Sequence, residues 1–196
     1  MSVIERLLRR DPTVDDPSTA GVTIGPMRRR DLRRGVMSIE AMSYPRPWSQ
    51  NVFESELSQA RSGSRCYLVA TRPSVRGRDE IVGYAGLWFT ADEAHVTNVA
   101  VRPDQQRTGV ATALLLALAD TAIERGCVAW TLEVRVSATG AQELYRRFGF
   151  NPAGVRARYY ENVEDAIVMW CNDIQGEDYR ALLDSLRAPD GSGGLR

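Results

Sequence analysis

The sequence predicts an α+β domain with a mixed sheet of about seven strands flanked by about four helices. Short apolar segments of strand character outnumber helical ones, and most of them follow one another as neighbouring hairpins. After the second strand, only two helical segments, residues 109–125 and 140–148, lie between strands. This order favours a mixed sheet over a doubly wound sheet, in which a helix follows almost every strand.

Each element has a local signal. The longest helix is predicted from Gly109 to Arg125 by the apolar spacing that begins at Val110, and Gly126 is expected just past its end. Ser49 is expected to cap a helix that ends near Ala60, because its hydroxyl can accept an unpaired backbone N–H. Further helices are expected over 31–42, 140–148 and 177–186. The expected strands are 22–27, 66–71, 81–90, 94–101, 128–134, 150–159 and 166–171.

The chain is expected to hold one domain between two peripheral segments. Residues 1–20 read as an N-terminal extension, because a short amphipathic stretch is followed by a polar segment with two prolines. Residues 21–174 form the predicted domain. Residues 175–196 are expected to give a C-terminal helix and a glycine-rich tail.

Composition excludes several classes of function. All 25 basic residues are arginine, so the lysine that a P-loop or a pyridoxal enzyme needs is missing. The 25 acidic residues balance them, which argues against direct nucleic-acid binding. Three scattered cysteines and one histidine give no convincing metal site. With neither a membrane-spanning run nor a signal peptide in evidence, we expect a cytoplasmic protein with reduced thiols and no membrane association.

The segment from Asn98 to Leu115 is the most informative for function. A strand is followed by a polar loop, and Gly109 stands at the start of the long helix. A glycine there lets the backbone approach a ligand, while the first-turn N–H groups offer positive charge to phosphate or pyrophosphate. A plain strand–turn–helix with glycine in a tight turn explains the same pattern about equally well.

A possible acid and base follow further along the chain. Glu133 interrupts an apolar strand, and strand alternation places it on the face opposite Leu132 and Val134. Tyr145 lies on the next helix. A carboxylate and a phenol can act as base and acid, although a solvated glutamate and a packed tyrosine are the commoner outcomes.

Four other side chains are weaker candidates for contact with a substrate. Trp48 can wall a peptide groove or simply anchor the turn between two helices. Tyr159 and Tyr160 are expected to flank a groove, one facing in and one facing out. His95 is interpreted as a surface residue at a strand start in preference to a substrate contact.

In this order, the segments resemble the GNAT acetyltransferase family. The loop from Gln106 to Ala111 matches its Q/R-x-x-G-x-G/A motif for acetyl-CoA, with alanine in the last position. Three further pieces resemble the RimI branch, the ribosomal-protein alanine N-acetyltransferases, and the resemblance covers about residues 22–172. They are Pro47-Trp48-Ser49, the stretch from Leu132 to Arg135 with Tyr145 and Gly149-Phe150, and Arg158-Tyr159-Tyr160 with Glu164-Asp165-Ala166.

The resemblance implies a sheet splayed open near its fourth and fifth strands, with acetyl-CoA as cosubstrate and no metal. It implies that Glu133 is the general base and Tyr145 the general acid, and that a protein N-terminal peptide, from a ribosomal protein, is the partner. It carries no implication for oligomeric state. The backbone from Val99 through Ala100 to Val101 is implied to hold the pantetheine and thioester. The implied pyrophosphate site is the run Arg107, Thr108, Gly109, Val110, Ala111 and Thr112.

One position departs from the family pattern. Asparagine usually stands five residues after the glutamate, where it touches the cofactor, and here Ala138 occupies that position. The contact is therefore missing or replaced by Ser137 or Thr139. The expected function is acetylation of an N-terminal α-amine, with alanine as the first residue. The alternatives are a GNAT enzyme acting on lysine side chains or a small amine, and an acetyl-CoA-binding module with little turnover.

Overall fold

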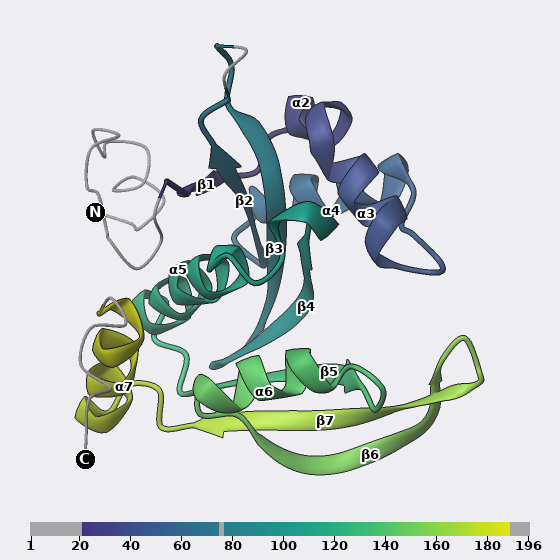
Figure 1. Ribbon diagram of the computed structural model, residues 1–196. Helices are drawn as coiled ribbons and strands as arrows, with labels where there is room; N and C mark the ends of the chain where they lie inside the picture. The colour runs from purple at the N-terminus through teal and green to yellow at the C-terminus, as the bar shows by residue number, and fades with distance from the viewer. Residues whose placement is uncertain (1–20, 75–76, 189–196) are drawn as a thin grey trace, which may run out of the picture.

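A computed structural model describes residues 21–74 and 77–188 of the chain. It contains a seven-stranded mixed sheet in the order β1-β2-β3-β4-β5-β7-β6. Figure 1 shows β1 to β4 in one half of the molecule and β5 to β7 in the other, with the two halves diverging. The α+β class and the seven strands predicted from the sequence are confirmed.

The strands agree closely with the predicted ranges. All neighbours pair antiparallel except β4 and β5, which α5 connects and which run parallel. Their bounds are β1 Thr23–Pro26, β2 Arg65–Arg72, β3 Glu80–Thr90, β4 Glu93–Val101, β5 Ala129–Arg135, β6 Asn151–Tyr160 and β7 Glu164–Asn172.

The helices differ more from expectation. The single helix predicted over 31–42 is broken into a short α2, a π-helical segment and α3. Ser49 precedes α4, but its side chain makes no cap hydrogen bond, so the predicted capping role of Ser49 is wrong. The extension 1–20 and the end of the tail, 189–196, lie outside the described residues. Helix bounds are α2 Arg29–Asp31, the π segment Leu32–Val36, α3 Met37–Ser43, α4 Gln50–Ala60, α5 Val110–Glu124, α6 Thr139–Arg147 and α7 Glu177–Arg187.

Two apolar cores cover the two faces of the sheet. The larger contains the buried face of α5 together with Leu132, Val134 and Tyr145, and α7 adds Tyr179 and Leu183 to it. The smaller joins α3 and α4 to residues of β2 and β3. Figure 1 shows α2 to α4 on one side of the upper strands and α5 on the other. The sheet therefore separates a face covered by α3 and α4 from a face covered by α5.

A buried carboxylate fixes the turn between α3 and α4. Glu40 is almost fully buried, and it accepts hydrogen bonds from the Tyr84 hydroxyl and, at 2.7 Å, from the Trp48 backbone N–H. The Trp48 ring packs on Phe53 with centroids 5.5 Å apart. This contact joins the Pro-rich turn to the sheet.

We expect Glu40→Leu to destabilise the fold. It removes the acceptor for a buried hydroxyl and a partly buried backbone N–H, and an unsatisfied buried donor costs about 1–3 kcal/mol, so a loss of about 2–4 kcal/mol in the free energy of unfolding is expected by urea denaturation. Glu143 is exposed on α6, so Glu143→Leu is the matched control with a change within about 0.5 kcal/mol. Equal effects of the two substitutions would show that Glu40 does not hold this turn.

Candidate active site

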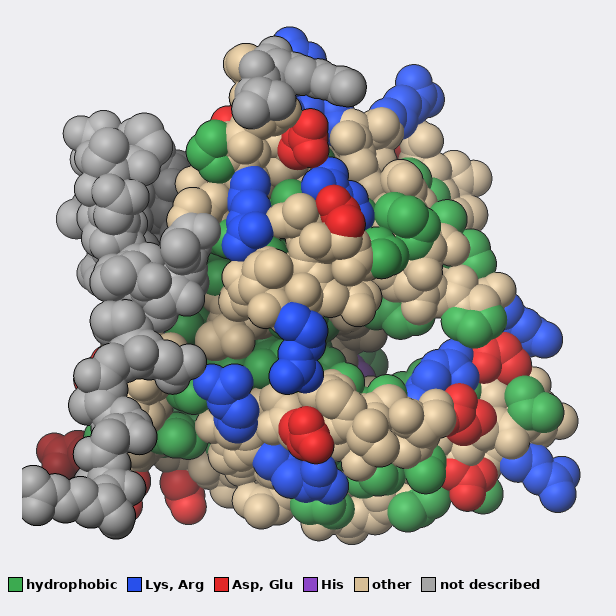
Figure 2. Space-filling model, viewed as in Figure 1, with side chains coloured by type: hydrophobic (Ala, Val, Ile, Leu, Met, Phe, Trp, Pro, Cys, Tyr) green, Lys and Arg blue, Asp and Glu red, His purple; other side chains and the backbone are tan. Residues whose placement is uncertain are grey.

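The candidate site is the opening between β4 and β5. The two strands pair from Glu93 with Ala129 to Val96 with Leu132, and no further pairs follow. Beyond that point β4 remains bonded only to β3, and β5 only to β7. The splayed sheet that the family resemblance implied is therefore present, and Figure 2 shows the molecule hollowed between its two halves.

Side chains satisfy the backbone carbonyls that the opening leaves without strand partners. The Tyr44 hydroxyl donates to Val99 O at 3.1 Å, and the Tyr160 hydroxyl donates to Glu133 O at 3.0 Å. The Gln142 amide donates to the carbonyls of Arg135 and Val136, at 3.0 and 2.9 Å. Since unpaired buried carbonyls are costly, these bonds hold the opening in a defined shape.

The loop at one end of the opening has the geometry of an anion site. Gly109 stands before α5 in the left-handed region, with φ of 83°, and Arg107 also has a positive φ of 62°. Within the described chain, no acceptor is recorded for the first-turn N–H groups of Val110, Ala111 and Thr112. The exposed N-terminus of a helix of 15 residues is suited to phosphate. Thr108 is braced by a 3.0 Å bond from Arg72 to its carbonyl.

The backbone of Val99, Ala100 and Val101 lines the β4 side of the same opening. The register between β3 and β4 shifts at Gly86 and Leu87, which leaves Thr97 as an extra residue in β4. A bulge of this kind leaves a backbone N–H without its strand partner. The pairing of β4 with β5 ends at Val96, directly before this bulge.

Glu133 is the first residue of β5 after Leu132, the last residue of β5 that pairs with β4. Leu132 and Val134 face the core beside α5, so the Glu133 carboxylate faces the other side of the sheet, as alternation predicted. Its Oε2 lies 3.1 Å from His95 Nε2, and its Oε1 lies 2.9 Å from Arg156 Nη1. The hydrogen bond with His95 lowers the pKa of Glu133 most strongly, with Arg156 acting in the same direction, so the carboxylate is charged at neutral pH.

Tyr145 approaches the opening from the opposite face. It lies on α6 in the core cluster with Leu132 and Val134, and its ring stands edge-on to Phe150 at 5.8 Å. Burial raises the pKa of Tyr145 well above its usual value, and the nearby Tyr160 adds to the effect. The phenol therefore stays protonated at neutral pH. Its hydroxyl makes no hydrogen bond with any described residue, so it is available as a donor.

The three predicted substrate residues fall into different surroundings. Tyr160 faces in and bonds to Glu133 O, whereas Tyr159 is half exposed beside it, with the two rings edge-on at 5.1 Å. The Trp48 ring is partly buried and packs on the α3–α4 core.

Three residues at the opening were missed or misjudged from the sequence. His95 is not merely a surface residue at a strand start, because it bonds to Glu133 across the β4–β5 pairing. Tyr44 reaches Val99, and Arg156 reaches Glu133 from β6. His95 lies two residues before the Thr97 bulge, on the strand next to Glu133. Only the register of the two strands shows that these residues are close.

The missing asparagine is not replaced by Ser137. The Ser137 hydroxyl and its backbone N–H both donate to Glu164. Ala138 is the residue that precedes α6, and its side chain packs on the core. Both hydrogen-bonding groups of Ser137 are therefore engaged with Glu164.

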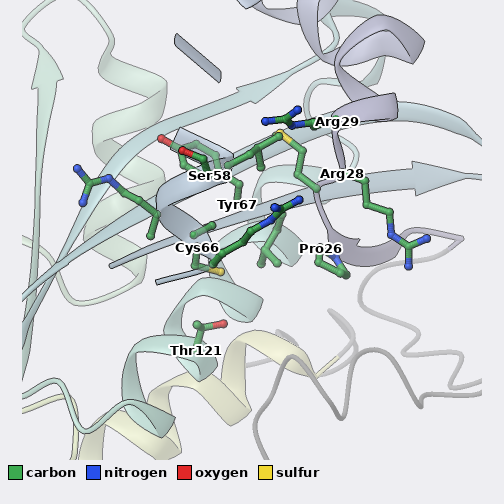
Figure 3. Close-up of a pocket in the computed structure, with 13 residues that line it drawn as sticks. Pro26, Arg28, Arg29, Ser58, Cys66, Tyr67 and Thr121 are labelled. Carbon is green, nitrogen blue, oxygen red and sulfur yellow. The ribbon is translucent and has the colours of Figure 1, made fainter. Parts of the chain in front are cut away.

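A separate pocket lies away from this opening. It has a volume of about 390 Å³ and lies between the β1–β2 edge, α4 and α5, with Cys66, Tyr67 and Thr121 among its lining residues (Figure 3). None of the predicted site residues lines it. Over residues 21–74 and 77–188, no group of three metal-ligating side chains was found, and no helix there is long and apolar enough to cross a membrane.

Comparison with known proteins agrees with this geometry. The acetyltransferase (GNAT) family model matches residues 33–150, which include most of the π-helical segment and the loop of Gly109. The chain belongs to the GNAT acetyltransferase family. It is an acyltransferase of the RimI-like type.

Its relatives include proteins named as N-terminal acetyltransferases. The [ribosomal protein bS18]-alanine N-acetyltransferase of Escherichia coli is 36% identical over 75% of this chain and 95% of its own. The N-alpha-acetyltransferase RimI of Mycobacterium tuberculosis is 35% identical over 72% of this chain and 86% of its own. The crystal structure of the E. coli ribosomal-protein-S18-alanine N-acetyltransferase superposes with a TM-score of 0.67 at 33% identity, covering 78% of this chain and 94% of that one. Thermoplasma volcanium Ard1, at 24% identity and a TM-score of 0.69, shares the fold over 78% of this chain and 98% of its own.

Enzymes of the GNAT family use acetyl-CoA, and the residues at the opening fit that molecule. The glycine-led helix N-terminus can receive the pyrophosphate, and the free edge of β4 can receive the amide groups of the pantetheine arm.

We expect Gly109→Asp to weaken acetyl-CoA binding by about tenfold or more, because a carboxylate would face the pyrophosphate and lost bonds to a charged group cost about 1.5–3 kcal/mol. Isothermal calorimetry measures the change. Gly126 has a similar φ of 77° at the other end of α5, so Gly126→Asp introduces comparable backbone strain away from the ligand. Equal loss in both variants would attribute the effect to strain, and unchanged affinity in Gly109→Asp would remove the phosphate site.

Proposed function

We propose that this enzyme transfers the acetyl group of acetyl-CoA to the N-terminal α-amine of a protein, with alanine as the first residue and a small-subunit ribosomal protein as the substrate. The relatives named for bS18-alanine acetylation support the substrate. The structural observation that carries the proposal is the placement of Glu133 and Tyr145 on opposite faces of the sheet at one opening. A base and an acid are then available on either side of the reacting carbon.

The substrate side of β4 and β5 is the face of the sheet on which α3 and α4 lie. His95 contacts Trp88 there, and Trp88 and Tyr159 both remain exposed. Aromatic side chains around an open entrance suit a peptide, because they supply contact area at low entropic cost. The acetyl-CoA side is the opposite face, where the N-terminus of α5 and Tyr145 lie.

The amine nitrogen loses two protons in the reaction, one before it attacks the thioester and one afterwards. An α-amine titrates near pH 8, so roughly a tenth is already free at pH 7, and Glu133 promotes loss of the first proton either directly or through a relaying group. The free amine then attacks the thioester carbon, and the carbon–sulfur bond breaks. Tyr145 supplies a proton to the leaving sulfur and regains one from the acetylated nitrogen. One proton is released overall, and no covalent enzyme intermediate is needed.

The backbone at the Thr97 bulge supports the charge that develops on the carbonyl oxygen. A backbone N–H freed by a bulge and pointing into an opening is suited to an oxyanion. In this proposal Val99, Ala100 and Val101 bind the cosubstrate arm, and the run from Arg107 to Thr112 binds its pyrophosphate.

A peptide assay tests the substrate class. We expect a peptide that starts with free alanine to be acetylated, and the same peptide with a blocked N-terminus and an internal lysine to be left unmodified. Release of free CoA thiol and the peptide mass report the result. Preferential modification of the blocked peptide would overturn the N-terminal proposal, and binding of acetyl-CoA without turnover of either peptide would indicate a binding module instead of an enzyme.

Tyr145→Phe tests the acid. The substitution keeps the buried ring and removes only the hydroxyl, so we expect kcat to fall by about 10²–10⁴-fold with little change in acetyl-CoA affinity. Tyr179 is a second buried tyrosine, but it lies on α7 in the core away from the opening, so Tyr179→Phe is the matched control. A loss below about threefold in Tyr145→Phe would return Tyr145 to a packing role.

A further inference from the structure

The chain contains one histidine, and it is bonded to the proposed base. His95 Nε2 and Glu133 Oε2 are 3.1 Å apart, across the last rungs of the parallel β4–β5 pairing. The His95 side chain is 27% exposed, whereas the Glu133 side chain is only 6% exposed. The histidine is therefore the member of the pair that solvent and substrate can reach.

The surroundings of Glu133 make it a poor direct acceptor. Both carboxylate oxygens already have partners, Oε2 with His95 and Oε1 with Arg156 at 2.9 Å. The same partners lower the pKa of Glu133, which further weakens it as a base. A buried carboxylate with a partner on each oxygen is better suited to orienting a neighbouring side chain than to receiving a proton from an incoming amine.

The geometry leaves one nitrogen of His95 free. With Nε2–H donating to Glu133, Nδ1 is the acceptor nitrogen, and it makes no hydrogen bond with any residue in the described part of the chain. The Trp88 ring packs edge-on against the imidazole, with centroids 6.3 Å apart, and limits its rotation. This arrangement matches the logic of a carboxylate that holds a histidine in one tautomer and stabilises its cation.

Resting on the proposed function, we propose that His95 Nδ1 accepts the first proton of the substrate amine, and that Glu133 positions the ring and stabilises the imidazolium. The amine nitrogen loses that proton before it attacks the thioester carbon. The imidazolium then releases the proton to water, which completes the net release of one proton. Histidine is suited to this step because its usual titration range lies nearest to neutral pH.

Charged groups reach the pair from three strands. Glu133 lies on β5, while Arg156 and Tyr160 approach it from β6, the latter through its bond to the Glu133 carbonyl. On the β3 side Trp88 separates His95 from Arg65, whose guanidinium stands 4.7 Å from the indole centroid and is paired with Glu56. Glu133 is thus the charged group in direct contact with the imidazole.

The test compares wild type with His95→Gln over pH 6–10, using the alanine-starting peptide or whichever amine the wild type acetylates. Glutamine keeps a donor for Glu133 and cannot take up a proton. We expect kcat/KM at pH 7 to fall by about 10²–10⁴-fold. We also expect the variant's rate to follow the free amine, so that the deficit shrinks as pH rises through about 8.

Imidazole rescue separates a proton acceptor from a structural residue. In His95→Gly, added imidazole is expected to restore activity in proportion to its unprotonated form. Thr131→Val is the matched control, because Thr131 is the β5 partner of His95 and donates to Met169 O at 2.9 Å. That variant is expected to stay within about threefold of wild type with an unchanged pH profile and no rescue.

The outcomes separate this inference from the proposed function. A wild type that acetylates no amine contradicts the proposed function, whatever the variants do. An active wild type with full activity in His95→Gln overturns the role of His95 alone. So does a uniform loss across pH 6–10 without imidazole rescue, because it would show that His95 only supports the fold of the site.

Discussion

The site depends on where β4 and β5 stop pairing. Four residue pairs hold these parallel strands together, from Glu93–Ala129 to Val96–Leu132, and the Thr97 bulge follows immediately. Past that point, backbone groups that a closed sheet would use are free to meet a ligand. The same divergence exposes carbonyls that need donors, and Tyr44, Tyr160 and Gln142 supply them. The opening is thus a feature of the hydrogen-bonded structure, maintained by side chains from both halves of the molecule.

Arginine and partly buried carboxylates organise the β5–β7 half. Arg135 bonds to Glu161 and Glu164 at 2.8 and 2.9 Å, and its guanidinium lies 4.1 Å from the Tyr160 ring centroid. A planar guanidinium can make all three contacts at once, which a lysine ammonium would do poorly. This matters for the site because Tyr160 is the residue that bonds to the Glu133 carbonyl. The acidic residues of the hairpin therefore hold Tyr160 in place more than they offer charge to a substrate.

The parts of this structure that were predictable are those set by local pattern. The seven strands follow from apolar segments and turns, and the loop of Gly109 follows from a glycine at a helix start. Strand alternation was enough to place Glu133 on its face. It also predicted that one of Tyr159 and Tyr160 faces in, but only the structure shows that this residue is Tyr160. The His95–Glu133 contact depends on the register of two strands that are joined through α5, and no local pattern carries that register. Tyr44 and Arg156 were missed for the same reason, since each reaches the opening from a distant segment. Ser49 shows the converse error, because a good capping residue type does not ensure that the side chain makes the bond.

The division of chemistry between two faces follows from the alternation of a single strand. Glu133 and its neighbours Leu132 and Val134 point in opposite directions, so one residue meets His95 while the others pack beside Tyr145. A reacting carbon held between β4 and β5 would then have a base on the α3–α4 side and a protonated phenol on the α5–α6 side. The His95–Glu133 bond also joins the two halves of the sheet at the rung where backbone pairing ends. A side-chain contact at that place limits how far the halves can separate, so the pair that would take part in proton transfer also holds the two edges of the opening together.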